Sequence, residues 1–238
     1  MTTVTRRSAL LGIFALSACS TAPDVGRSFD DPSDLPRGRG PAPGTEADIA
    51  GLSAALAALG SDVNPEEAAR AARISYVHTY ELAQLYEITD PALIHNHKVN
   101  TGTKPRGLCN DWAEDMEKRL VAEDFSSLQV QRAIGAVIGI DHSTVIITRP
   151  GDSIYEGIVV DPWRRGGRLT WIETSQDTIW GWEPQFTVHD RRVRALHAGT
   201  GKDTITYVVE DKPPRCLVLS GPGAQAPSTT DLTRCIGT

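Results

Sequence analysis

The feature that most constrains the fold is one change in hydrophobic pattern, which falls near residue 125. Before it, apolar residues recur at helical spacing, and after it short apolar runs alternate with Gly, Pro and Asp turns. Helices followed by an antiparallel sheet indicate an α+β domain, with N-terminal helices packed on the sheet. The predicted helices cover 45–59, 64–86, 91–98 and 109–120, and the predicted strands cover 128–138, 143–148, 157–161, 168–172, 185–188 and 204–209.

Composition excludes several classes of protein. The 238 residues are 40% hydrophobic, which is enough to bury the core of one domain. Lys and Arg number 24 against 30 Asp and Glu, so a net charge of −6 gives no electrostatic reason to expect a nucleic-acid partner. Beyond the N-terminus, no apolar stretch is long enough to span a bilayer.

The N-terminus has the pattern of an export signal. Arg6 and Arg7 precede a short apolar run at 8–16, which ends in Leu-Ser-Ala-Cys at 16–19. This tetrapeptide resembles the bacterial lipobox, which implies a signal peptide at 1–18 and a lipid on Cys19. The paired arginines leave general secretion and twin-arginine export both open. Residues 19–44 are rich in Pro and Gly and predict a flexible tether, so we expect a domain at 45–238 anchored to a membrane in the cell envelope.

Four cysteines are present, and they divide by their context. Cys19 is assigned to the lipid, while Cys216 and Cys235 both lie in a Pro/Gly-rich tail after residue 212. Export places the chain where neighbouring thiols tend to pair, so we expect a disulfide between Cys216 and Cys235. Cys109 is left as a lone thiol, which is either buried and inert or used in chemistry.

The surroundings of Cys109 favour chemistry. It follows Gly107 and begins a predicted helix, where the positive end of the helix dipole favours the thiolate. His142 begins one predicted strand and Asp161 ends the next, and the two strands are joined by a turn at 149–152. Antiparallel pairing of these strands brings the imidazole and the carboxylate together, as a Cys-His-Asp triad requires.

The segments Gly-Leu-Cys-Asn-Asp-Trp-Ala at 107–113 and Val-Val-Asp-Pro-Trp at 159–163, with His142 between them, resemble the papain-like/transglutaminase-like Cys-His-Asp superfamily. The resemblance covers about residues 90–185. It implies that Cys109 is the nucleophile, His142 the general base and then acid, and Asp161 the group that orients the imidazole. An oxyanion hole would use the backbone N–H of Cys109 and a side-chain amide, for which we favour Asn100, because Thr103 stands where papain-like enzymes often have Gln.

Other motifs are weaker. His95 and His97 lie two residues apart without a further ligand at metal-binding spacing, so we expect no metal and no cofactor. Arg164–Arg165 and the arginines at 191–194 are interpreted as solvated surface. The tryptophans at 171, 180 and 182 either line a cleft beside the site or pack in the core.

Three functions follow from these patterns. The first is thiol-dependent acyl transfer or hydrolysis of an amide or peptide bond, with a peptide or peptidoglycan-type substrate. The second is a non-catalytic lipoprotein of the same fold that binds peptide or cell wall. The third is a structural envelope lipoprotein in which Cys109 is simply buried. Oligomeric state is not predicted.

Overall fold

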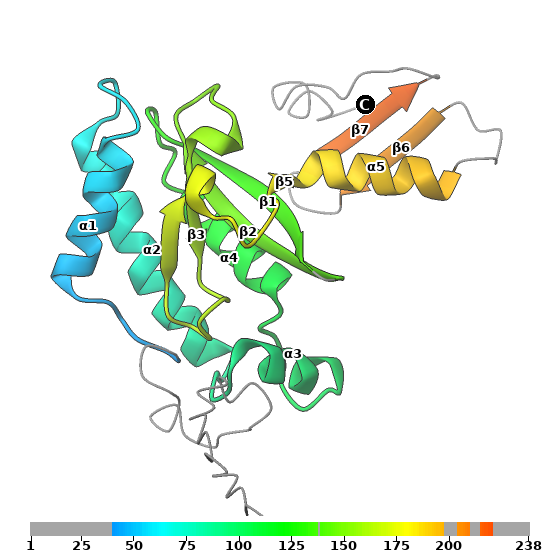
Figure 1. Cartoon of the computed structure of the whole chain (residues 1–238), viewed down its shortest axis with the longest axis horizontal. Helices are drawn as coiled ribbons and strands as arrows, with labels where there is room; N and C mark the ends of the chain where they lie inside the picture. Colours follow the sequence, from blue (N-terminus) through cyan, green and yellow to red (C-terminus); the bar gives the residue numbers. More distant parts are fainter. Residues whose placement is uncertain (1–39, 138, 198–203, 210–214, 221–238) are drawn as a thin grey trace, which may run out of the picture.

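Four helices come first along the chain and an antiparallel sheet follows them, as predicted (Figure 1). The computed structural model describes residues 40–137, 139–197, 204–209 and 215–220. The helices are α1 (Glu46–Ala57), α2 (Pro65–Leu85), α3 (Ala92–Asn100) and α4 (Cys109–Val121).

The main sheet has five antiparallel strands in the order β4-β3-β2-β1-β5. Two single-turn 3₁₀ helices, η2 (Ile154–Glu156) and η3 (Thr174–Gln176), interrupt the connections. The strands are β1 (Gln129–Val137), β2 (Ile140–Thr148), β3 (Ile158–Asp161), β4 (Thr170–Glu173) and β5 (Glu183–Pro184).

The first two helices each begin at a capping residue. Thr45 caps α1, and the Asp48 carboxylate accepts hydrogen bonds from the backbone N–H and the hydroxyl of Thr45, both at 2.8 Å. Asn64 caps α2 by accepting from the backbone N–H of Glu66 at 2.8 Å, and Pro65 occupies the first helical position. These ends satisfy backbone donors that a helix cannot satisfy itself.

Glu67 ties α2 to the connection between α4 and β1. Its buried carboxylate accepts four hydrogen bonds, from the backbone N–H and the hydroxyl of Ser126 and of Ser127, at 2.7 to 2.9 Å. Burial alone would raise the pKa of Glu67, but these four bonds stabilise the charged form and lower the pKa to about 2. The carboxylate therefore holds the helical layer against the sheet as an anion.

The two faces of the sheet support different parts of the core. Alternate residues of β2 and β3 point to opposite faces. Val145, Ile147 and Val160 pack with buried side chains of α1, α2 and α4. Ile146 and Val159 belong to a second cluster, which includes the tryptophans Trp112, Trp163, Trp180 and Trp182.

The predicted strand at 185–188 is wrong, because these residues begin helix α5 (Gln185–His197). Phe186 and Val188 alternate with polar residues, but four residues are too few to separate a period of 2 from one of 3.6. The charged segment that follows carries no turn signal and continues the helix. Arg191 on α5 also bonds back to Glu183 of β5 at 2.7 and 2.8 Å.

The tail contains a strand that the sequence analysis did not predict. β7 (Arg215–Ser220) pairs with the predicted strand β6 (Thr204–Val209), and Cys216 lies opposite Val208 in this two-stranded sheet. The disulfide prediction stays untested, because Cys235 and the Cys216 side chain lie outside the described residues. The predicted signal peptide, the predicted lipidation site Cys19 and most of the predicted tether lie outside them too.

In the part of the chain that the structure describes, no helix combines the length and the apolar composition that a bilayer span requires.

Candidate functional site

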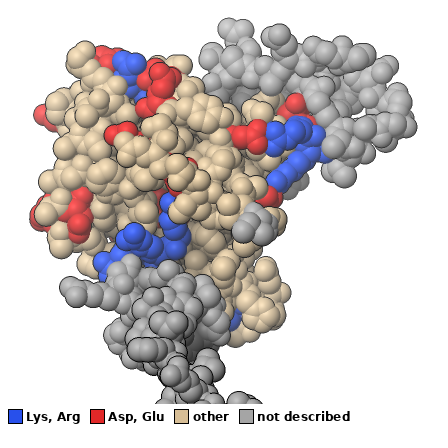
Figure 2. Space-filling model, viewed as in Figure 1, with Lys and Arg blue, Asp and Glu red and all other residues tan. Residues whose placement is uncertain are grey.

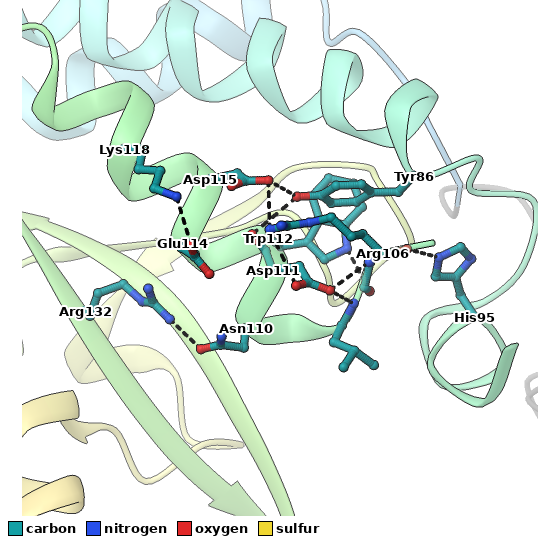
Figure 3. Close-up of polar contacts among 12 residues, drawn as sticks. Tyr86, His95, Arg106, Asn110, Asp111, Trp112, Glu114, Asp115, Lys118 and Arg132 are labelled. Atoms are coloured by element: carbon teal, nitrogen blue, oxygen red, sulfur yellow. Dashed lines mark hydrogen bonds and ion pairs between the residues drawn. The ribbon is translucent and has the colours of Figure 1, made fainter. Parts of the chain in front are cut away.

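Cys109 occupies the first position of α4, as predicted. Its thiol is free and partly exposed. The Asp111 carboxylate accepts from the backbone N–H groups of Gly107 and Leu108, both at 3.0 Å, and so closes the loop before the helix (Figure 3). Since the helix supplies no partner for the N–H of its first residue, the Cys109 N–H is available to a bound oxyanion.

Besides Asp111, two further side chains hold the loop before Cys109. His95 Nε2 donates to the carbonyl of Arg106 at 2.8 Å, and Trp112 Nε1 donates to the carbonyl of Gly107 at 3.1 Å (Figure 3). Gly107 has a φ of 124°, and a Cβ there would collide with the His95 ring. The buried His95, which the sequence analysis considered only as a metal ligand, therefore positions the loop before Cys109 instead.

Behind this loop, a polar cluster joins α2 to α4. The Tyr86 hydroxyl donates to Asp115 Oδ2 at 2.6 Å, and Arg106 forms an ion pair with the same carboxylate at 3.1 Å (Figure 3). Burial and the neighbouring Asp115 raise the pKa of Tyr86, so the phenol keeps its proton. The sequence alone carried no signal for this cluster, because its members come from three separate segments.

His142 and Asp161 meet through strand pairing, as predicted. Val145 pairs with Val160 in the β2–β3 ladder, which places His142 diagonally across from Asp161 on the same face. His142 Nε2 donates to Asp161 Oδ2 at 2.6 Å, and both side chains are fully buried. This hydrogen bond leaves Nδ1 as the ring nitrogen for the thiol.

Asp161 is saturated with donors. Its Oδ1 accepts from the backbone N–H groups of Trp163 and Arg164 at 3.0 and 3.1 Å, and its Oδ2 also accepts from Arg164 Nε at 2.8 Å. Burial alone would raise the pKa of Asp161, but His142 and Arg164 hold it below its usual range. The carboxylate is therefore an anion at neutral pH.

Arg164 is not the solvated residue that its sequence context predicted. Besides Asp161, its guanidinium contacts Asp177 Oδ2 at 2.6 Å, and that oxygen also accepts from Trp182 Nε1 at 3.0 Å. A basic dipeptide does not show which of its members turns inward. Here Arg164 turns inward and joins two buried carboxylates, while Arg165 is exposed.

Three tryptophans surround the His142 ring. The ring centroids of Trp163, Trp180 and Trp182 lie 4.6, 4.6 and 5.4 Å from that of His142. Trp180 and Trp182 are therefore packed against the imidazole. Trp171 lies elsewhere, with its Nε1 donating to the Tyr76 hydroxyl at 3.0 Å.

Gly135 makes room for this packing. It lies opposite His142 in the β1–β2 ladder, and a Cβ there would meet Trp180 Cβ at 2.9 Å and Trp182 Cε3 at 3.0 Å. The glycine is needed for space and not for backbone freedom, because its φ is not positive. A side chain at this position would push Trp180 and Trp182 away from the imidazole.

The thiol lies beside the His142 end of β2. Cys109 Sγ donates to the carbonyl of Asp141, the residue before His142, at 3.8 Å. His142 Nδ1 is buried and has no hydrogen-bond partner among the described residues. Burial would lower the pKa of His142, but Asp161 and, to a smaller extent, Cys109 raise it to about 9. The sulfur is thus close enough to act on the imidazole charge.

A second oxyanion donor is not evident around Cys109 in the described part of the chain. Asn100 is the last residue of α3, is exposed, and makes no hydrogen bond there to Cys109. Asn96 on the same helix accepts from Trp163 Nε1 at 3.0 Å and so holds one of the tryptophans around His142. The role of Asn100 stays a prediction.

Comparison with protein families, with curated proteins and with solved structures finds no match to this chain.

Proposed function

We propose that this protein is a thiol-dependent acyl transferase or hydrolase of the papain-like/transglutaminase-like type, with Cys109 as nucleophile. The observation that carries the proposal is the alignment of three groups from separate elements. A free thiol at the start of α4 lies beside a buried imidazole, whose far nitrogen bonds a buried carboxylate at 2.6 Å. A structural lipoprotein has no need of a buried charged pair next to an accessible thiol.

The raised pKa of His142, at about 9, sets the order of the proton transfers. The imidazole carries a proton at neutral pH, so His142 acts first as an acid. Cys109 reacts as the thiolate paired with this imidazolium, its S–H proton being the one that His142 holds. The thiolate sulfur forms a bond to the carbonyl carbon of the substrate, and the carbonyl electron pair moves to oxygen beside the Cys109 N–H. When the C–N bond breaks, the leaving amine takes the proton of His142 and a thioester remains.

In the second half-reaction, water or an amine attacks the thioester and gives its proton to His142. The C–S bond breaks, and the sulfur leaves as the thiolate. Asp161 keeps the imidazole in one orientation throughout. An amide or peptide bond in the cell envelope is the substrate class that we propose, with the domain tethered through Cys19.

The test is the reactivity of Cys109 toward iodoacetamide at pH 6, read by mass spectrometry of its peptide. A free thiol is only about 0.3% ionised at this pH, so an unassisted cysteine reacts slowly. We expect Cys109 to react at least about tenfold faster than free cysteine. His142→Gln should return the rate to that of free cysteine, and Cys109→Ala serves as the blank.

A second arm separates catalysis from binding. The protein is mixed with an activated acyl ester, and the mass of the Cys109 peptide is followed with time. Formation and decay of an acyl adduct on Cys109 supports the enzyme. A reactive thiol that never releases the acyl group supports the binding function, and a thiol no faster than free cysteine supports the structural one.

A further inference from the structure

A cavity of about 290 Å³ lies beside the loop that joins β3 to β4. Arg165 and Arg168 line it from this loop, and Asp48 and Tyr76 line it from α1 and α2. In Figure 2, basic side chains gather on the face viewed, near the ends of β3 and β4. This cavity plays no part in the proposed thiol chemistry.

The two arginines of the cavity differ from all other basic side chains that the structure describes. Every other Lys and Arg between residues 40 and 192, the part of the chain whose side chains are described, lies within 3.6 Å of a carboxylate oxygen, in the ion pairs of residues 70, 73, 98, 104, 106, 118, 119, 132, 149, 164, 191 and 192. Within that part of the chain, only Arg165 and Arg168 form no such pair. Both of them line the same cavity.

Arg168 carries a further sign of a missing partner. Its Nε is buried and has no hydrogen-bond partner within the described chain. A buried N–H without an acceptor costs free energy, so a position of this kind points to an acceptor that binds there. The Tyr76 hydroxyl adds a donor, because it accepts from Trp171 Nε1 and keeps its own proton to donate.

The loop is shaped so that its arginines face two ways. Gly166 and Gly167 have φ values of 62° and 83°, which side chains rarely adopt. Just before these glycines, Arg164 turns inward to Asp161. Arg165 and Arg168 line the cavity instead. The turn therefore separates a guanidinium that joins two buried carboxylates from two that form no ion pair with the described residues.

We propose that this cavity binds a phosphate group, held by Arg165 and Arg168 with the Tyr76 hydroxyl as a further donor. A guanidinium group can donate two parallel N–H bonds to the oxygens of one phosphate. The two positive charges of Arg165 and Arg168 also exceed the single negative charge of the Asp48 carboxylate. The phosphate belongs either to a soluble phosphate ester or to a phospholipid headgroup. Cys109 does not line this cavity, so phosphate binding can be tested separately from the proposed enzyme activity.

The experiment measures binding of inorganic phosphate and of glycerol 3-phosphate to the full chain carrying Cys19→Ser, by calorimetry at constant ionic strength. Arg168→Gln should weaken binding by about tenfold or more, since a charge-assisted hydrogen bond is lost. Arg168→Lys keeps the positive charge but loses the two parallel N–H donors, so its affinity should lie between those of the parent and Arg168→Gln. Asp48→Asn should tighten binding, because it removes the only carboxylate that lines the cavity among the described residues.

Arg119→Gln is the matched control, because it removes one positive charge on α4, away from the cavity, and should leave binding unchanged. Vesicles of phosphatidylglycerol identify the source. Retention on vesicles that Arg168→Gln abolishes assigns a lipid headgroup, and binding in solution alone assigns a soluble ester. The proposal is overturned if neither probe binds, or if the folded Arg168→Gln chain binds both as well as its parent.

Discussion

Replacing Asp161 by Asn should change the pH dependence of stability, and the structure sets the size of the effect. The carboxylate is the main cause of the rise in the pKa of His142 from 6.5 to about 9. A rise of about 2.5 pKa units corresponds to about 3 kcal/mol of folding free energy. Because both groups are fully buried, solvent screens little of this interaction.

The sign follows from proton binding. Between pH 6.5 and 9 the folded chain holds a proton on His142 that the unfolded chain has released, so stability falls as the pH rises. Without the carboxylate, burial keeps the pKa of His142 at or below 6.5, and this loss disappears. We therefore expect Asp161→Asn to destabilise the protein most below pH 6.5, and by about 3 kcal/mol less near pH 9.

Urea denaturation of both chains at pH 6, 7.5 and 9 measures this difference, and NMR titration of the His142 ring gives its pKa directly. Repeating the measurement of parent and Asp161→Asn in a Cys109→Ala background isolates the smaller contribution of the sulfur to the pKa of His142. Asp152→Asn, which breaks an ion pair with Arg149 at the other end of the hairpin, is the matched control. A destabilisation by Asp161→Asn that is the same at all three pH values would refute the reasoning.

Three further outcomes are expected. Arg164→Gln should cost about 3–5 kcal/mol in urea denaturation, because it leaves buried carboxylates without their cation, whereas the exposed Arg165→Gln should stay within about 0.5 kcal/mol of the parent. Gly135→Ala should cost about 1–3 kcal/mol of folding free energy by overpacking the tryptophans, and it should slow iodoacetamide labelling of Cys109. Gly181→Ala has open space at its Cβ and should do neither, so equal effects of the two variants would contradict the packing argument. Glu67 should contribute about 3 kcal/mol to the stability that the parent loses as the pH falls from 4.5 to 2, since this carboxylate must take up a proton there, and Glu67→Gln should reduce the loss in acid denaturation by that amount.

The local features of the candidate site could be predicted because each depends on neighbours in the chain. A cysteine just after Gly107 at the start of an apolar-periodic segment predicts a thiol at a helix N-terminus. His142 and Asp161 flank a short hairpin, and antiparallel pairing leaves little freedom in where they meet. The error at 185–188 has the same origin, because a four-residue window cannot separate helix from strand.

What surrounds these groups was decided only by the tertiary structure. Nothing in the pair Arg164–Arg165 shows that one side chain joins two buried carboxylates while the other faces a cavity. That division depends on the two left-handed glycines that follow, and on a buried Asp177 thirteen residues further along. His95 likewise supports the loop before Cys109 only because the fold brings α3 against Gly107.

The sequence by itself therefore determined the order of helices and strands, the helix caps and the meeting of His142 with Asp161, since hydrophobic period and strand pairing act over short distances. The tertiary structure alone decided which charges are buried, which partners neutralise them and which arginines stay unpaired. Those properties depend on desolvation and on contacts between distant segments, and neither is encoded in a local pattern.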